Sequence, residues 1–172
     1  MLVVFGGLPG TGKTTLARIV AARYAAVYLR IDTIEQAIRS SGVLRKHIGP
    51  AGYLTAYRVA ADNLNVGRSV VSDSVNPLKV TRDSWAEIAR LAGVPLIEIE
   101  VVCSNFEEHR ARVEGRHSDI EGLLMPSWRD VIEIGYEPWS APHIVLDTAS
   151  KTIAESQDGL MQELADARQS SG

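Results

Sequence analysis

The apolar residues of this chain gather in short runs that are separated by longer amphipathic stretches. The runs predict five strands, at 2–5, 26–31, 69–73, 96–102 and 143–147. The stretches between them place apolar residues at helical spacing and predict helices over 14–24, 33–40, 51–66, 77–92, 106–116, 126–135 and 152–167. Strands that alternate with helices in this way predict a parallel α/β sheet, covered by helices on both faces, with right-handed crossovers.

The length of 172 residues fits a single domain, 1–172, better than two. One cysteine, Cys103, excludes an internal disulfide bond and a zinc site built from several cysteines. The apolar runs are too short to cross a membrane, and the stretch MLVVFGGLPG is too short and too rich in glycine for a signal peptide. We therefore expect a soluble cytoplasmic protein, a monomer or a homodimer, without a membrane partner.

The net charge of −3 argues against a protein that coats nucleic acid, but the charge is unevenly distributed. Residues 1–86 contain 11 Lys and Arg against 5 Asp and Glu, whereas residues 87–172 contain 7 against 16. Two interpretations stay open. The helices of the two halves simply differ in surface charge, or the first half holds an anionic ligand.

The sequence between the first strand and the first helix, GLPGTGKT, matches the phosphate-binding pattern G-x-x-x-x-G-K-[ST]. Its glycines let the backbone turn so that successive N–H groups point at phosphate oxygens. Lys13 adds a positive charge near the β- and γ-phosphates, and Thr14 offers a hydroxyl to Mg²⁺. The pattern predicts ATP and Mg²⁺ as ligands. The predicted nucleotide-binding residues of this loop are Gly7, Leu8, Pro9, Gly10, Thr11, Gly12, Lys13, Thr14 and Thr15.

A phosphate loop identifies the ligand but not the reaction, because GTPases, ATP-driven machines and small kinases all use it. The chain lacks the N-K-x-D motif that recognises guanine, and no paired Asp-Glu closes the third strand as in ATP-driven machines. The chain is also too short to include a mechanical domain. The prediction that remains is a kinase, which transfers the γ-phosphate of ATP to a hydroxyl group.

Five features, in this order, resemble the small P-loop kinases of the zeta-toxin-like, chloramphenicol-phosphotransferase-like and polynucleotide-kinase-like group, which have an AAA-type ATP-binding domain. They are GLPGTGKTTLA, Asp32 after the second strand, SVVSDSVNP followed by Arg82, HRARVEGR, and YEPW leading into HIVLDT. The resemblance implies a P-loop NTPase fold, a three-layer αβα sandwich with a five-stranded parallel sheet of order 2-3-1-4-5. It also implies an ATP–Mg²⁺ site at the carboxyl ends of the strands.

Asp32 is the predicted carboxylate that orients or deprotonates the acceptor hydroxyl, because it ends the second strand and the resemblance places the base there. An Asp before an Ile-x-x-Ala-Ile pattern would also cap a helix, and that alternative stays open. Glu35 lies almost one helical turn further on and is predicted to share the acceptor site. In polynucleotide-kinase-like proteins an arginine stands at about that position, so Glu35 argues against a nucleic-acid acceptor.

Asp73 ends the third strand and is predicted to bind Mg²⁺ together with Thr14, or to contact the acceptor. The alternative for Asp73 is a role in the turn beside Asn76. Arg82, in the helix that follows, is a further candidate for the acceptor site. The alternative for Arg82 is a surface residue in contact with solvent.

The charged segment 106–122 is predicted to be a lid that closes over the nucleotide. At 100° per residue, Arg112 and Arg116 lie within about 40° of each other on a helix, where two arginines clamp the transferring phosphates. The alternative is an exposed helix whose arginines are balanced by acidic neighbours. By resemblance, the loop that begins at Asp147 and Thr148 borders the adenine ring.

The segment 42–67 is predicted to bind the acceptor, with Tyr53 and Tyr57 on one helix face as candidate lining residues. The packing of a hydrophobic core explains the same two tyrosines. Our leading hypothesis is an ATP- and Mg²⁺-dependent kinase whose acceptor is a nucleoside, a sugar or an antibiotic. A 5′-hydroxyl polynucleotide kinase and a nucleotide-dependent regulatory module without phosphoryl transfer are the alternatives.

Overall fold

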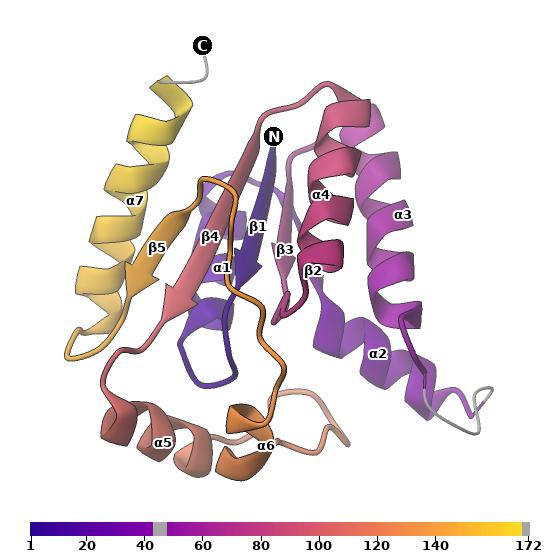
Figure 1. Cartoon of the computed structure of the whole chain (residues 1–172). Helices are drawn as coiled ribbons and strands as arrows, with labels where there is room; N and C mark the ends of the chain where they lie inside the picture. The colour runs from indigo at the N-terminus through magenta and orange to yellow at the C-terminus, as the bar shows by residue number, and fades with distance from the viewer. Residues whose placement is uncertain (43–47, 170–172) are drawn as a thin grey trace.

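The computed structural model describes residues 1–42 and 48–169, so part of the predicted acceptor segment, 43–47, lies outside the described residues. Its centre is a parallel sheet of five strands, which lie in the order β2-β3-β1-β4-β5 (Figure 1). Their bounds are Leu2–Gly6 (β1), Val27–Arg30 (β2), Val70–Asp73 (β3), Leu96–Val102 (β4) and Ile144–Asp147 (β5). This sheet confirms the predicted P-loop NTPase topology. Since all pairings are parallel, the carboxyl ends of the strands share one edge.

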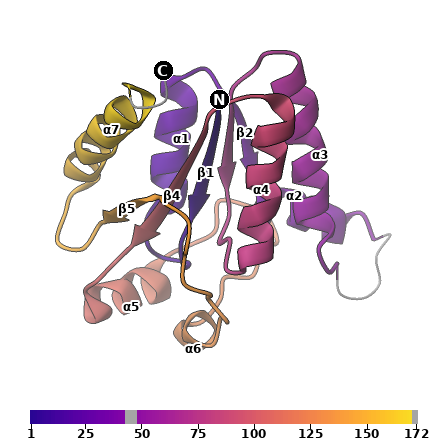
Figure 2. The same cartoon turned by 45° about the horizontal axis from the view of Figure 1, so that its top comes forward.

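Helices cover the sheet on both sides and confirm the three-layer αβα arrangement (Figure 2). Their bounds are Lys13–Arg23 (α1), Ile31–Ser40 (α2), Ala51–Asn65 (α3), Lys79–Ala92 (α4), Phe106–Gly115 (α5), Trp128–Ile132 (α6) and Ile153–Gln169 (α7). Val3 and Phe5 of β1 pack toward α1 and α7, whereas Leu2 and Val4 pack toward α3 and α4. Burial on both faces explains why β1 is continuously apolar. None of the described helices combines the length and apolarity of a membrane span.

The second strand is shorter than predicted, and Asp32 does not end it. β2 stops at Arg30, whose extended backbone takes the N-cap position, and α2 begins at Ile31 without an intervening loop. Asp32 therefore lies in the first turn of α2, where a carboxylate favours the helix dipole. The interpretation of Asp32 as the N-cap of this helix is wrong.

The two helices after β4 also end earlier than predicted. α5 stops at Gly115, and Arg116 already has an extended backbone (φ −85°, ψ 146°). α6 begins at Trp128 because the side chain of Ser127 accepts a hydrogen bond from the backbone N–H of Asp130 in a capping box. The chain between α5 and α6 is an irregular connection with a turn at Glu121 and Gly122.

One face of β4 is covered by irregular chain instead of a helix. Burial alternates along β4, so that Glu98 and Glu100 point away from the core that Ile99 shares with α1. The segment 133–143 crosses in front of β4 in Figure 1, and we call it the crossing segment. Its Trp139 packs so closely over the end of β1 that a Cβ at Gly6 would lie 2.4 Å from the ring. Chain without helix therefore covers this part of β4, although helices cover the sheet as a whole on both sides.

Candidate active site

The loop between β1 and α1 has the backbone that the phosphate-binding pattern requires. Gly7, Gly10 and Gly12 have positive φ angles of 130°, 88° and 94°. A Cβ at Gly7 would lie 2.2 Å from the carbonyl oxygen of Val101, and one at Gly10 would lie 2.6 Å from Cγ2 of Val113. Glycine is therefore needed here both for its conformation and for the close approach of β4 and α5.

Lys13 is the first residue of α1 and is buried, with 6% of its surface exposed. Its ammonium group lies 3.5 Å from the carbonyl oxygen of Leu8, which is a weak contact. Burial lowers the pKa of Lys13, and the carboxylates of Asp73 and Asp32 oppose that shift. An anionic ligand at this position would stabilise the buried positive charge.

Asp73 is buried at the end of β3, next to β1 in the sheet. Its Oδ2 accepts a hydrogen bond of 2.7 Å from the hydroxyl of Tyr28, and Nε of Arg30 lies 3.9 Å from the same oxygen. Burial and the charge of Asp73 both raise the pKa of Tyr28, which therefore stays protonated and donates. Thr14, in the first turn of α1, is half-buried and lines the cavity beside the loop.

Asp32 and Glu35 project from α2 into one cavity, together with Arg39. Glu35 accepts a hydrogen bond of 3.1 Å from Arg39, while burial raises the pKa of Glu35. Glu35 is held against α3, because a Cβ at Gly52 would lie 2.3 Å from its Cγ. Asp32 is half-buried and contributes its negative charge toward Lys13.

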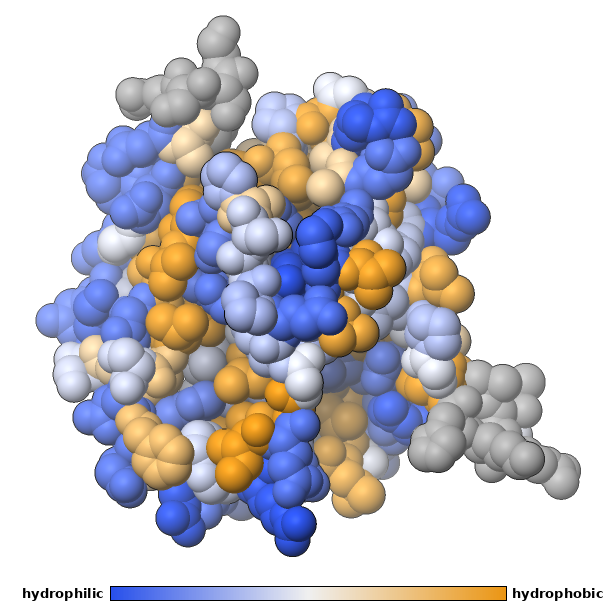
Figure 3. All heavy atoms as spheres, in the orientation of Figure 1, coloured by the Kyte–Doolittle hydropathy of each residue, from blue (hydrophilic) through white to orange (hydrophobic). Residues whose placement is uncertain are grey.

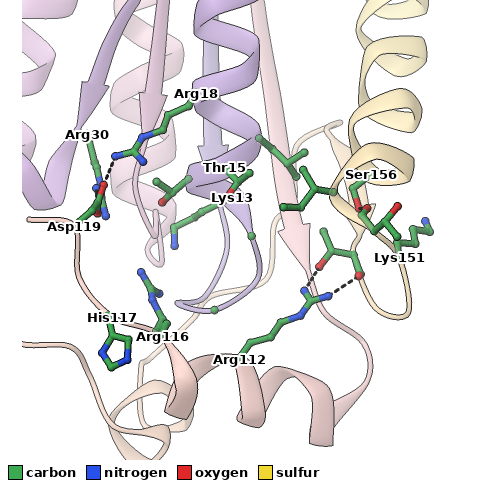
Figure 4. A pocket seen from close by; sticks show the side chains of 17 residues that line it. Lys13, Thr15, Arg18, Arg30, Arg112, Arg116, His117, Asp119, Lys151 and Ser156 are labelled. Carbon is green, nitrogen blue, oxygen red and sulfur yellow. Dashed lines mark hydrogen bonds and ion pairs between the residues drawn. The ribbon is translucent and has the colours of Figure 1, made fainter.

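The two candidate arginines of the lid do not lie on one helix face. Arg112 donates to the hydroxyl of Thr148 at 2.8 Å and to the carbonyl oxygen of Thr148 at 2.9 Å (Figure 4). Arg116 follows the end of α5 and points toward Lys13 in the same view. Burial lowers the pKa of Arg116, and the nearby carboxylate of Asp32 opposes that shift. Because α5 ends between them, Arg112 contacts Thr148 whereas Arg116 lies toward Lys13.

Asp147 and Thr148 fix the loop after β5 to its neighbours. Asp147 accepts hydrogen bonds of 3.0 Å from the backbone N–H groups of Ser104 and Ala149. The hydroxyl of Thr148 lies 2.9 Å from the carbonyl oxygen of Thr11, to which it donates, so this loop is tied to the phosphate loop. Thr148 lines the cavity beside the phosphate loop, whereas Asp147 holds the turn behind it.

Two cavities meet at the phosphate loop. The first, which we call the loop cavity, has a volume of 470 Å³ and contains seven of the predicted nucleotide-binding residues: Gly10, Gly12, Lys13, Thr14, Thr15, Arg112 and Thr148. The second, which we call the α2 cavity, has a volume of 580 Å³ and contains Asp32 and Glu35. Lys13 and Arg116 line both cavities.

Four predicted acceptor residues line neither cavity: Asp73, described above, and Tyr53, Tyr57 and Arg82. The hydroxyl of Tyr57 donates to the carbonyl oxygen of Thr81 at 3.0 Å, and the hydroxyl of Tyr53 accepts a hydrogen bond from the backbone N–H of Asn76. Arg82 is buried and donates to the carbonyl oxygen of Asn76 at 2.9 Å. The surface alternative for Arg82 is therefore wrong, and the packing interpretation of the tyrosines fits their contacts.

Sequence reasoning missed Asp119, which accepts hydrogen bonds from Arg18 of α1 and, at 2.7 Å, from Arg30 at the end of β2. The hydrogen bonds from Arg30 and Arg18 hold the pKa of Asp119 well below its usual range. These contacts anchor the chain after α5 beside the loop cavity. No motif surrounds Asp119, and its partners are distant in the sequence, so no signal in the sequence pointed to it.

Comparisons with known proteins agree with this geometry. The model of one family, AAA domain (AAA_33), matches residues 2–122 of the chain. The adenylyl-sulfate kinase of Synechococcus is 28% identical over 172 residues, which cover 94% of this chain and 92% of that protein. The ESX-3 secretion system protein EccA3 of Mycolicibacterium smegmatis is 24% identical over 174 residues, or 95% of this chain and 26% of that protein. The chain thus spans about a quarter of the length of EccA3.

Solved structures share the fold. Kti12 of Chaetomium thermophilum, in complex with ADP-AlF3, has a TM-score of 0.70 at 24% identity, over 97% of this chain and 98% of that chain. The APS kinase of Mycobacterium tuberculosis, in complex with AMPPNP and APS, has a TM-score of 0.67 at 18% identity, over 95% and 96%. A gluconokinase of Sinorhizobium meliloti has a TM-score of 0.64 at 18% identity, over 99% and 97%.

The family match covers more than two thirds of the chain and includes the phosphate loop, α2 and the anchor at Asp119. The sheet order is the one that the resemblance implied, and the glycine conformations are those that the phosphate-binding pattern requires. The chain therefore belongs to the AAA domain family, and it shares its fold with the solved structures of Kti12, the APS kinase and the gluconokinase.

Proposed function

We propose that the protein is an ATP- and Mg²⁺-dependent phosphotransferase that phosphorylates a hydroxyl group of a small molecule. One observation carries the proposal: the loop cavity and the α2 cavity meet at the cations of Lys13 and Arg116. Phosphoryl transfer needs a donor and an acceptor on two sides of a positive centre, because negative charge is spread over the transferring group in the transition state.

The residues of the loop cavity fit a nucleoside triphosphate. The glycine-rich turn allows backbone N–H groups at the start of α1 to face phosphate oxygens. The same oxygens would stabilise the buried ammonium group of Lys13. Arg112 and Thr148 line the same cavity together with Lys151 and Ile153, where the base would bind. ATP would supply the transferable phosphoryl group there.

The donor set also fits Mg²⁺, which prefers carboxylate and hydroxyl oxygens. Thr14 at the start of α1 and Asp73 at the end of β3 would hold the ion, Asp73 through a water molecule. Tyr28 occupies Oδ2 of Asp73, so the other carboxylate oxygen is the one available to that water. The bound ion would neutralise charge on the phosphates.

Asp32 would accept the proton of the acceptor hydroxyl. Its carboxylate lines the α2 cavity with Lys13 and Arg116, so a hydroxyl bound beside it faces the two cations that would hold the phosphoryl group. Orientation of that hydroxyl is the main contribution expected of such a carboxylate. Glu35, paired with Arg39, would contribute hydrogen bonds to the same acceptor.

The test measures ADP formation with a panel of hydroxyl compounds. Lys13→Ala is expected to lower acceptor-dependent ADP formation at least 100-fold, because a main phosphate contact is lost. Asp32→Asn is expected to keep ATP affinity and lower turnover by 100-fold or more. Lys79→Ala and Asp62→Asn, on exposed parts of α4 and α3, are the matched controls and retain activity.

Two results would contradict this proposal. Wild-type turnover by Asp32→Asn would remove the acceptor carboxylate from the mechanism. ADP formation that no acceptor stimulates, nucleosides and 5′-hydroxyl oligonucleotides included, would favour a regulatory module over a kinase. Far-ultraviolet circular dichroism of each variant confirms that a loss of activity is not a loss of fold.

A further inference from the structure

The α2 cavity has two walls of opposite character. On one side, α2 presents Asp32, Glu35, Gln36, Arg39 and Ser40. On the other side, the chain before α6 presents Leu123, Leu124, Met125 and Pro126, which we call the apolar wall. Pro9 and Val75 complete the lining at the end near the phosphate loop. The cavity therefore offers hydrogen bonds to one face of a ligand and apolar contact to the other.

The apolar wall contains one exposed residue, Leu124, and three that are partly buried, Leu123, Met125 and Pro126. Leu124 is 92% exposed, the largest value among the exposed large apolar residues of the described chain. In Figure 3 several apolar side chains lie among polar ones over α5 and α6. Leu124 lines the α2 cavity, so a ligand bound in that cavity would cover its exposed side chain.

The wall is held in place from both ends. Gly122 has a φ of 74° and approaches α2 so closely that a Cβ would lie 2.9 Å from Nε2 of Gln36. After the wall, the capping box at Ser127 starts α6. The ring of Trp128 packs edge-on against the ring of His109, with 5.1 Å between the two ring centroids. His109 in turn bonds the carbonyl oxygen of Pro9 at 2.8 Å. The apolar wall is thus fixed relative to the phosphate loop.

We propose that the acceptor is an amphipathic hydroxyl compound, with an apolar ring that covers Leu124 and hydroxyl groups that face α2. This inference rests on the proposed phosphotransferase function and specifies its substrate class. A volume of 580 Å³ lies within the range of about 300–1,000 Å³ that is typical of sites for drug-sized ligands. A small sugar acid would leave the apolar wall uncovered, and the gain from burying that wall would be lost.

The experiment compares acceptors that share their hydroxyl groups and differ in one apolar ring. Phenyl β-glucoside is paired with glucose, and benzyl riboside with ribose, while gluconate and adenylyl sulfate represent polar, anionic acceptors. In each pair the ring-bearing compound is expected to have a KM at least tenfold lower. Equal KM values within both pairs, or a preference for gluconate or adenylyl sulfate, would overturn the proposed substrate class.

A variant of the wall tests the same point from the side of the protein. Leu124→Ser is expected to raise KM for the ring-bearing acceptor about tenfold, with kcat and the KM for ATP unchanged. Leu91→Ser is the matched control, since Leu91 is 69% exposed on α4 and lines neither cavity at the phosphate loop. An unchanged KM in Leu124→Ser would contradict the role of the wall.

A binding measurement separates this inference from the proposed function. Calorimetric titration of phenyl β-glucoside into the protein with AMPPNP reports on the wall without any phosphoryl transfer. Binding that Leu124→Ser weakens would support the wall even if no acceptor stimulated ADP formation. Absence of binding by both ring-bearing probes would overturn the inference, even if other compounds were phosphorylated.

Discussion

Asp119 shows what a single carboxylate does at the edge of this site. It joins Arg18 of α1, Arg30 at the end of β2 and the chain that leaves α5. The side chain of Arg30 is only 5% exposed and also lies 3.9 Å from Asp73, so the two carboxylates beside it stabilise its buried charge. Loss of Asp119 would leave a buried guanidinium group with one distant counter-ion.

Asp119→Asn is therefore expected to lower the free energy of unfolding at neutral pH, as urea unfolding measures it. Because the pKa of Asp119 in the folded protein lies below its usual 3.8, the stabilisation is present above that value. It is lost as the pH falls through the folded-state pKa. The difference between wild type and variant is thus constant above about pH 5 and shrinks in stronger acid.

Asp158→Asn, on an exposed part of α7, is the matched control and shows no such difference. If the difference in the free energy of unfolding between wild type and Asp119→Asn grew as the pH fell, the prediction would be contradicted. That outcome would mean that Asp119 is not stabilised as an anion in the folded protein.

Among the elements, the crossing segment matters because it supports the root of the phosphate loop. Trp139 packs over Gly6, and Cζ of Arg82 lies 5.0 Å from the centroid of its ring. Arg82 also donates to the carbonyl oxygen of Asn76, whose side chain donates to the carbonyl oxygen of Phe5 at 3.0 Å. The last residues of β1 are therefore braced by the crossing segment together with Arg82 of α4.

Trp139→Ala is expected to lower the free energy of unfolding by about 2 kcal/mol, since a half-buried ring is removed and leaves a gap. Acceptor-dependent ADP formation is expected to fall as well, because the loop loses its support. Urea unfolding and a kinetic assay measure the two effects. Trp139→Phe, which keeps most of the packing, is expected to restore both, and an alanine variant with wild-type stability would contradict the bracing role.

At the scale of the whole molecule, a nucleotide that binds only the folded protein stabilises it. At about 100 times its Kd, ATP adds about 2.7 kcal/mol to the free energy of unfolding. For a domain of this size, that corresponds to a rise in Tm of roughly 5–10 °C. Thermal unfolding with and without ATP measures this shift. Lys13→Ala is expected to abolish most of it, and an equal shift in Lys79→Ala and Lys13→Ala would contradict the assigned phosphate contact.

The fold followed from the sequence because its signals are local. The continuous apolar run of β1, the glycine turn and the apolar spacing of α1 lie within the first 24 residues and determine one βα unit. The ends of α2 and α5 were less predictable. Arg30 takes the N-cap position of α2 through its backbone conformation, and α5 stops before Arg116. The spacing of apolar residues predicts neither of these helix ends.

The candidate site was predictable only where its residues are neighbours in the chain. The loop from Gly7 to Thr14 is one motif, whereas Asp119 and Arg30 are 89 residues apart. The wall at Leu124 faces α2 only because a glycine turn and the cap of α6 orient it. Contacts of this kind depend on tertiary packing, which periodicity and motifs do not encode.

The two cations that belong to both cavities have a consequence for the energetics of binding. A nucleotide that neutralises Lys13 and Arg116 would leave the carboxylate of Asp32 without these two nearby cations, so the affinity for the proposed acceptor would depend on the nucleotide. By thermodynamic linkage, the acceptor changes the affinity for the nucleotide by the same factor. The donor and the acceptor that we propose would thus be heterotropic effectors of each other, without any need for a second conformation.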